Sequence, residues 1–330
     1  MIKINGESGG GQILRTALGL SAITQKPFEI TNIRKSRPQP GLKEQHLQGL
    51  LAIKKLTDAQ VDAKIGTTKL TFKPQTIKEG NLKVKVSTAG SLGLILQVLL
   101  IPAIKTNLNI SITGGATFAK WAPPIYHYEN ILLPLLNYKA KINIKKHGFY
   151  PKGGAQLEVF SPKTQLKPIN LEKGDPIEIT GISIASNHLK KKRVAERQAN
   201  HSKKILSKLN LPIKIKTQYV DSLNPGSGIQ LTLKTSTTLY GGDSIGELKK
   251  TAEKVAEDAC KTLLDGFVSG TVDKHTADML LPYIALAGGS IIAPEITNHI
   301  KTNIQTIEHF LDVKFKIEGN KIYINKQNIN

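Results

Sequence analysis

The stretch SLGLILQVLLIPAIKTNLNISIT, residues 91–113, decides the fold class. Residues 91–104 form the longest apolar stretch of the chain, 14 residues with Gln97 inside it. A helix that crosses a membrane needs about 20 such residues, so this stretch predicts a buried helix instead. Residues 108–113 are predicted to form a strand. A helix that leads into a strand in this way is typical of an α/β domain.

The same order of elements occurs three times along the chain. In each copy a helix leads to a strand, then to a second helix and then to a hairpin. Each sheet is expected to bury one face against its own pair of helices, which predicts an α/β domain of three pseudo-symmetric repeats. The expected elements are helix 11–24, strand 28–31, helix 40–56 and hairpin 61–73 in the first copy; helix 91–104, strand 108–113, helix 124–138 and hairpin 140–160 in the second; and helix 274–287, strand 290–293, helix 295–311 and hairpin 313–324 in the third.

Residues 177–266 are an excess of about 90 residues between the second and the third copy. They contain predicted strands at 177–185, 213–219 and 229–233, and predicted helices at 194–209 and 247–264. We therefore predict two domains: a three-repeat domain made of residues 1–176 and 267–330, and a small inserted α/β domain made of residues 177–266.

The charge of the chain is strongly basic. The 46 lysines and arginines outnumber the 25 acidic residues, which gives a formal net charge of +21. Such a field attracts polyanions, and nucleic acid is the partner that it favours. The alternative is a lysine-rich surface that is merely solvated. Aromatic residues are only 5% of the chain, which argues against an extended base-stacking platform for single strands.

The remaining composition is that of a folded intracellular protein. Apolar residues are 39% of the chain and glycines number 28, which excludes a disordered or collagen-like chain. The single cysteine, Cys260, cannot form an internal disulfide, as expected in a reducing cytosol. The first residues, MIKING, lack the apolar core of a signal peptide. We expect a cytoplasmic protein without a membrane partner.

Two segments could bind phosphate, although no Walker A loop, GxGxxG fingerprint, zinc pattern or nucleophile elbow occurs in the sequence. Residues 9–12, GGGQ, open the first predicted helix and could present free backbone N–H groups to an anion. A plain flexible turn explains them equally well. In residues 34–46, RKSRPQPGLKEQH, Arg34 and Arg37 lie in a proline-braced loop that leads to a helix, a geometry suited to bidentate phosphate binding. The alternative is a pair of surface arginines.

A histidine begins the last predicted helix. Ile296, Ile300 and Ile304 mark the buried stripe of that helix, so His299 is expected off the core face, with Asn303 one turn further on the same side. An imidazole at this position could attack a phosphorus atom while the helix N-terminus holds the departing charge. The alternative is an ordinary surface histidine.

Taken together, the short segments of the sequence closely resemble the RNA 3′-terminal phosphate cyclase family, and the resemblance covers the whole chain in the right order. The segments are GGGQILR at 9–15, IRKSRPQPGLKEQH at 33–46, STAGSLGLILQ at 87–97, WAPP at 121–124, HGFYPKGG at 147–154, HTADMLLPYIALAGG at 275–289 and ITNHIKTNIQTIEHFL at 296–311. The resemblance implies a catalytic domain of three repeats like the C-terminal domain of a bacterial translation initiation factor, with a small thioredoxin-like insert.

The resemblance also implies a reaction. His299 would attack the α-phosphorus of ATP and release pyrophosphate, and the AMP would pass to the 3′-phosphate of an RNA. The neighbouring 2′-OH would then displace AMP and leave a 2′,3′-cyclic phosphate. The implied partners are ATP, RNA with a 3′-phosphate end, and a divalent cation, Mg²⁺ or Mn²⁺.

The resemblance assigns roles by position. The nucleophile is His299. The ATP or AMP site comprises Gln97, Pro123, His275, Asp278 and Asn303, with Pro123 and His275 on either face of adenine. The RNA 3′-phosphate and nucleotide phosphates are held by Arg15, Arg34, Arg37, Gln45 and His46, and the metal by Glu7.

Three positions depart from the family pattern. The usual GEGGGQ is altered around residues 7–12, where Ser8 stands between Glu7 and the glycines, which displaces Glu7 by one residue as a metal ligand. Met279 stands where a glutamine is common, which removes one polar contact to the nucleotide. His275 replaces a frequent tyrosine, and an imidazole can still stack on a base.

The sequence leaves other functions open. A catalytically silent relative that serves ribosome assembly as an RNA-binding protein has the same fold and charge, but such relatives are expected to lack the histidine present here at position 299. A carboxyvinyl transferase built from the same repeats needs six copies, and this chain has room for three. The sequence leaves open whether the protein forms a homodimer, and what the run of basic residues at 190–193 does: it could follow an RNA backbone or be a solvated helix start.

Overall fold

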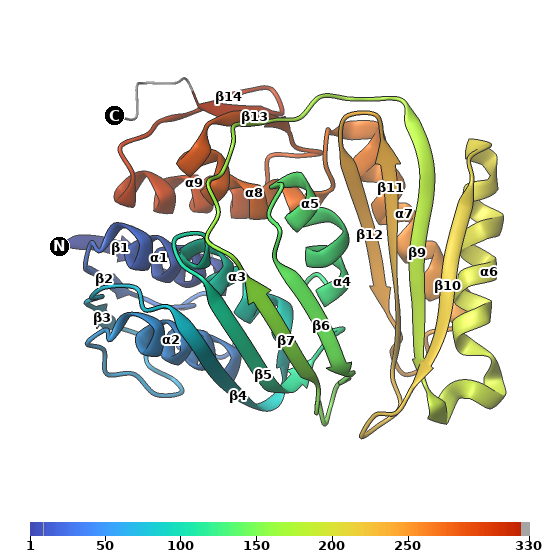
Figure 1. Ribbon diagram of the computed structural model, residues 1–330, viewed down its shortest axis with the longest axis horizontal. Helices are drawn as coiled ribbons and strands as arrows, with labels where there is room; N and C mark the ends of the chain where they lie inside the picture. Colours follow the sequence, from blue (N-terminus) through green and yellow to red (C-terminus); the bar gives the residue numbers. More distant parts are fainter. Residues whose placement is uncertain (9, 325–330) are drawn as a thin grey trace.

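The computed structural model describes residues 1–8 and 10–324 and shows a mixed α/β fold with four small sheets (Figure 1). Three of the sheets begin with a parallel pair of strands to which an antiparallel strand is added. The fourth belongs to the inserted segment. No helix in the described part of the chain is long and apolar enough to cross a bilayer.

The first sheet has the order β1-β2-β3 and carries the loop with Arg34 and Arg37. The predicted hairpin at 61–73 is wrong in its first arm, which forms no strand. The backbone there bonds instead to the loop before α2: Gly66 N–H donates to Leu42 O at 2.8 Å, and Leu42 N–H donates to Thr67 O at 3.0 Å. The elements are β1 (Ile2–Asn5), α1 (Gly10–Thr24), β2 (Phe28–Thr31), α2 (Glu44–Thr57) and β3 (Leu70–Phe72).

The second sheet has the order β4-β5-β7-β6. The predicted helix at 124–138 is present at 125–135, with a π-helical turn in its middle. Its elements are β4 (Gly80–Ser91), α3 (Leu92–Ala103), β5 (Leu108–Ala116), α4 (Ile125–His127), η1 (Tyr128–Leu132), α5 (Leu133–Leu135), β6 (Lys141–Lys146) and β7 (Gln156–Ser161).

The third sheet has the order β14-β15-β13-β8, and its first strand precedes the inserted segment in sequence. The insert therefore interrupts the third unit instead of lying between the second and the third. Helix α8 begins and ends where the sequence predicts, because Asp273 caps its first turn and Gly288 (φ 87°) follows its last residue. The elements are β8 (Ile169–Asn170), α8 (Lys274–Ala287), β13 (Gly289–Ile292), α9 (Asn298–Phe310), β14 (Phe315–Glu318) and β15 (Lys321–Ile324).

The inserted segment has a sheet of the order β10-β9-β11-β12 and a hydrophobic core of its own. Strand β12 was not predicted, because Gly241 and Gly242 weaken the strand pattern. They are needed there: a Cβ at Gly242 would lie 2.3 Å from the carbonyl oxygen of Ala259 in α7. The elements are β9 (Pro176–Ser186), η2 (Asn187–Lys192), α6 (Val194–Leu206), η3 (Ser207–Leu209), β10 (Ile213–Val220), β11 (Ser227–Thr235), β12 (Leu239–Ile245) and α7 (Ala252–Ser269).

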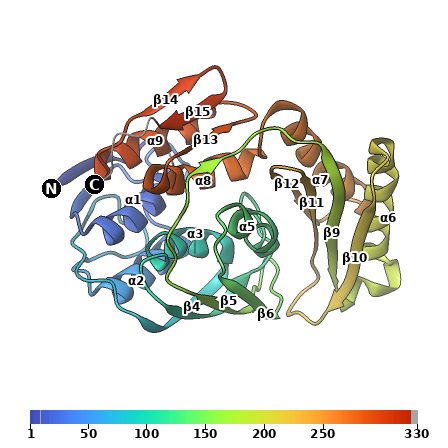
Figure 2. The same cartoon turned by 45° about the horizontal axis from the view of Figure 1, so that its top comes forward.

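Helices fill the space between the second and third sheets. In Figures 1 and 2 the sheet of β13, β14 and β15 lies at the top, the sheet of β4 to β7 lies at the bottom, and α1, α3 and α8 lie between them. The three sheets and these helices share one hydrophobic core. The first turns of α1 and α9 and the N-terminal half of α8 are brought together in this arrangement, and they carry several residues of the candidate site.

Candidate active site

His299 lies in the first turn of α9, as predicted, and its side chain is exposed to solvent. Thr297 caps the helix by accepting a hydrogen bond from Ile300 N–H at 3.1 Å. Asn298 donates to Ser8 O at 3.1 Å, which ties this turn to the loop before α1. The imidazole therefore projects from a helix N-terminus beside the glycine-rich turn, where the helix dipole favours negative charge.

Gln12 holds the His299 ring by a hydrogen bond between its Oε1 and the ring Nδ1. The orientation of the Gln12 amide follows from its other contacts, because Nε2 donates to the Asp278 carboxylate and to His299 O. Oε1 can only accept, so Nδ1 carries the ring proton. The lone pair of Nε2 is then free, and that is the nitrogen able to act as a nucleophile.

The surroundings of the His299 ring favour its uncharged form, because the base of the ring is partly desolvated although the residue is exposed. Burial lowers its pKa, and Arg15, Arg37 and Lys274 add to this, while the Asp278 carboxylate opposes them. A neutral imidazole with an unprotonated nitrogen is the reactive form.

Asp278 and Asn303 form the back of the site. Asn303 donates from Nδ2 to Asp278 O and Oδ1, both at 3.0 Å, and its Oδ1 accepts from Thr16 Oγ1 at 2.7 Å. Asn303 is buried, which corrects the prediction that it lies off the core face: that side of α9 packs on α1. Burial raises the pKa of Asp278, while His299, Asn303, Arg15 and Gln12 favour its charged form.

Gly11 is required by close approach of a side chain, and Gly10 by its backbone conformation. A Cβ at Gly11 would lie 2.1 Å from His46 Nε2, and a Cβ at Gly10 (φ 60°) would lie 3.3 Å from an Arg37 nitrogen. The turn is thus a cradle beneath a histidine and an arginine and not merely a flexible connection. Gly9 lies outside the described residues.

His46 is a neutral hydrogen-bond donor at this turn. Its Nδ1 accepts from Lys43 N–H at 3.1 Å, so the ring proton is on Nε2, which faces Gly11. Burial lowers the pKa of His46 to about 3, with Arg15, Arg34 and Lys43 contributing. The ring therefore stays neutral and offers an N–H group at any pH near neutrality.

Arg15 projects from α1 beside the same turn. Its Nε donates to Gln97 Oε1 at 2.8 Å, which brings together two of the predicted site residues. Burial lowers the Arg15 pKa, yet a guanidinium remains charged at neutral pH. Arg15 and the exposed Arg37 supply positive charge on the side of the turn where His299 lies.

Arg34 and Gln45 contribute differently. Arg34 is buried, and its Nη1 donates to Gln39 O at 2.9 Å and Gly41 O at 2.8 Å. In this structure it therefore braces the loop that presents Arg37. Gln45 lies in the first turn of α2, against Gly90 at the end of β4.

Glu7 lies in the loop between β1 and α1, 3.6 Å from Lys35 in an ion pair. No group of three or more metal-ligating side chains occurs within residues 1–8 and 10–324. A single partly exposed carboxylate still fits Mg²⁺, which is commonly held by one or two carboxylates together with substrate phosphates.

His275 lies one helical turn before Asp278 on α8 and lines a pocket of about 300 Å³. Trp121 and Ala122 line the same pocket, whereas Pro123 is buried and is not among the lining residues. Gly93 allows the backbone of Pro123 to approach α3 closely, because a Cβ at residue 93 would lie 2.6 Å from Pro123 O.

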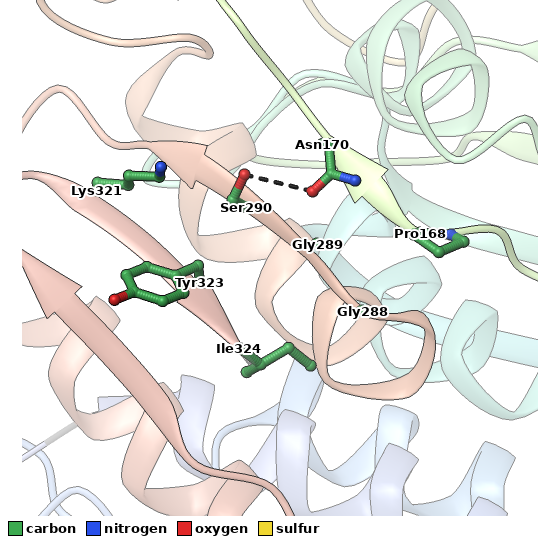
Figure 3. Close-up of a pocket in the computed structure, with 8 residues that line it drawn as sticks. All are labelled: Pro168, Asn170, Gly288, Gly289, Ser290, Lys321, Tyr323 and Ile324. Atoms are coloured by element: carbon green, nitrogen blue, oxygen red, sulfur yellow. Dashed lines mark hydrogen bonds between the residues drawn. The ribbon is translucent and has the colours of Figure 1, made fainter. Parts of the chain in front are cut away.

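A second pocket of about 310 Å³ lies on the third sheet (Figure 3), where Ser290 donates to Asn170 at 3.4 Å. None of the predicted site residues lines it.

Gln12 and Thr16 were not predicted as site residues. Both lie on α1 and are separated by 287 positions from the residues of α9 that they bind, His299 and Asn303. The only signal was the glutamine directly after the glycines.

Comparison with known proteins assigns the chain to a family. A sequence model described as RNA 3′-terminal phosphate cyclase matches residues 6–317. The protein named RNA 3′-terminal phosphate cyclase of Pyrococcus abyssi (strain GE5 / Orsay) is 43% identical over 331 residues, covering 97% of this chain and 96% of the relative. That of Sulfurisphaera tokodaii is 41% identical over 338 residues, covering 98% of each. The chain therefore belongs to the RNA 3′-terminal phosphate cyclase family.

Proposed function

We propose that this protein converts the 3′-terminal phosphate of an RNA to a 2′,3′-cyclic phosphodiester, using ATP and a covalent histidine–AMP intermediate on His299. The observation that carries the proposal is the contact between His299 Nδ1 and Gln12 Oε1, because it leaves Nε2 unprotonated beside a basic, glycine-lined turn. The names of the relatives support the same overall reaction.

In the first step His299 Nε2 attacks the α-phosphorus of ATP. A P–N bond forms, the bond from the α-phosphorus to the bridging oxygen breaks, and pyrophosphate leaves. Arg15 and Arg37 neutralise the charge that develops on the phosphates, and the His46 Nε2–H is placed to donate to an oxygen at the glycine turn. Asp278 and Gln12 keep the ring aligned as it becomes positively charged.

In the second and third steps the nucleotide leaves the histidine. An oxygen of the RNA 3′-phosphate attacks the α-phosphorus, the P–N bond breaks and neutral His299 is restored. The adjacent 2′-OH then attacks the terminal phosphorus, loses its proton and displaces AMP. Because this attack is intramolecular, the entropic cost of bringing two reactants together is largely avoided.

The remaining site assignments complete the proposal. Gln97, Gln45 and Arg34 hold the phosphate-binding groups in place, and Asn303 holds Asp278. His275, with Pro123, is assigned to the adenine base. Glu7 would hold a divalent cation, Mg²⁺ or Mn²⁺, which would supply charge neutralisation to the triphosphate when bound.

We further propose the domain boundaries and the symmetry given by the sequence: a catalytic three-repeat domain of residues 1–176 and 267–330, and an inserted thioredoxin-like domain of residues 177–266. The shared strand pairing of the three sheets and the separate core of the insert support this division. The cytoplasm is the proposed location.

The test is labelling with ATP that carries the label in its α-phosphate. The intact protein, with a divalent metal, is expected to retain label that is labile in acid and stable in alkali, as a P–N bond is. His299→Ala should retain none, while His309→Ala, which changes another histidine of the same helix, should label normally. An RNA with a 3′-phosphate should then become resistant to phosphatase.

The competing function is that of a catalytically silent RNA-binding relative. It predicts RNA binding without any label on the protein. Label that persists in His299→Ala would contradict the assignment of the nucleophile.

A further inference from the structure

The pocket beside His275 is shared by the two parts of the chain. One wall is formed by Trp121, Ala122 and His275, and the other by Asp243 and Ser244 at the end of β12, in the inserted segment. The position of β12 relative to α8 is fixed by Asp273, which accepts from Gly241 N–H at 2.9 Å and caps α8. The insert thus contributes directly to a pocket that opens onto the helix of Asp278.

Asp243 is the unpaired acid of this pocket. The neighbouring acids have partners: Glu247 pairs with Lys120, and Asp258 pairs with Lys250 at 2.8 Å. Over residues 1–8 and 10–324 the Asp243 side chain has neither a hydrogen-bond nor an ion-pair partner, although it is only partly exposed. Burial raises the pKa of Asp243 to about 6, so at neutral pH it is mostly an ionised group that can only accept hydrogen bonds.

The location of the pocket identifies the part of the nucleotide that would enter it. Asp278 is hydrogen-bonded to Gln12, which holds His299, and His275 lies three residues before Asp278 on the same face of α8. If the α-phosphorus lies at His299, the base points along α8 toward His275 and Asp243.

We propose that Asp243, from the inserted segment, selects adenine in ATP by accepting a hydrogen bond from the exocyclic amino group of the base. The inference rests on the proposed function and adds a determinant of nucleotide specificity to it. An amino group gives the unpaired carboxylate the donor it lacks. Hypoxanthine, which has a carbonyl oxygen at the same position, would place two acceptors against each other.

Binding can be measured without catalysis, because Trp121 lines the pocket and is the only tryptophan of the chain. Its fluorescence would be titrated with ATP and with ITP, in the absence of RNA, for the intact protein, Asp243→Ala and Asp265→Ala. The last variant removes an exposed carboxylate of α7 as a control. The rate of self-labelling with each α-labelled nucleotide would be measured in parallel.

We expect the intact protein and Asp265→Ala to prefer ATP over ITP by about tenfold, the size of one charge-assisted hydrogen bond. Asp243→Ala should bind the two nucleotides equally, chiefly by losing affinity for ATP, and should still become labelled. An unchanged ATP preference in Asp243→Ala would overturn the inference. A second result would also overturn it: the intact protein is labelled by GTP as well as by ATP, and Asp243→Ala loses only the labelling by GTP. Absence of label from every protein would instead contradict the proposed function, and the fluorescence titration would still test Asp243.

Discussion

At the scale of single residues, the site depends on a chain of hydrogen bonds that ends at one imidazole. Thr16 binds Asn303, Asn303 binds Asp278, Asp278 binds Gln12, and Gln12 binds His299. Thr16, Asn303 and Gln12 have little freedom, because all three are buried. Gln12 is the positioning residue in direct contact with the imidazole, so its replacement tests how far the orientation of the ring matters.

Gln12→Ala should slow self-adenylylation on the order of tenfold to a hundredfold, because the ring then samples the tautomer with its proton on Nε2. The loss should fall on kcat and spare KM for ATP. Nitrogen NMR shifts of the His299 ring should show the change of tautomer. Gln305→Ala, an exposed glutamine of α9, should leave both rate and shifts unchanged. Unaltered shifts in Gln12→Ala would contradict the role given to this amide.

At the scale of elements, the start of α1 packs directly against the start of α2. His46 is buried against Gly11, and its position depends on the capping contact with Lys43. The backbone of Gly11 is helical, so alanine would be tolerated by the helix itself. The conflict with the His46 ring is the only steric obstacle below 3.0 Å found at this position.

Gly11→Ala should therefore reduce the rate of RNA end modification by displacing His46. A double-mutant cycle measures this coupling. In a His46→Ala background, which removes the ring, adding Gly11→Ala should cause little further loss. Rates for the four proteins would be measured with RNA ending in a 3′-phosphate. Independent, multiplicative losses would show that the glycine acts in another way, for example by direct approach to phosphate.

The elements also show what a sequence can predict. Helix α8 and strand β2 match their predicted bounds, because local capping and hydrophobic periodicity determine them. The prediction of a first strand in the hairpin at 61–73 was wrong, because the backbone there forms hydrogen bonds with the loop before α2. In the site, the resemblance led to His299, but the contact with Gln12 exists only after the first and last units pack together. The burial of Asn303 has the same origin.

At the scale of the whole molecule, three buried histidines link stability to pH. Burial lowers the pKa of His46 to about 3, of His127 to about 4 and of His147 to about 4. In the unfolded chain each takes up a proton near pH 6.5. Between pH 6.5 and about 4 these three side chains thus bind more protons in the unfolded state, so their contribution to the free energy of unfolding falls as the pH falls. Asp243, Asp278 and Glu129 act in the opposite direction, because burial raises the pKa of each carboxyl group.

We expect each histidine to contribute up to about 1.4 kcal/mol per pH unit to this slope. Urea unfolding at several values between pH 7 and pH 4.5 measures it. His147, held by Thr117 at 3.0 Å and lying outside the site, is the one to replace. His147→Gln should reduce the slope of unfolding free energy against pH by the contribution of one histidine, although it also lowers stability at pH 7. His188→Gln, which changes an exposed histidine, should leave that slope unchanged. Equal slopes in both variants would mean that His147 titrates alike in the folded and unfolded chains, and that burial in this fold leaves its ring as basic as it is in water.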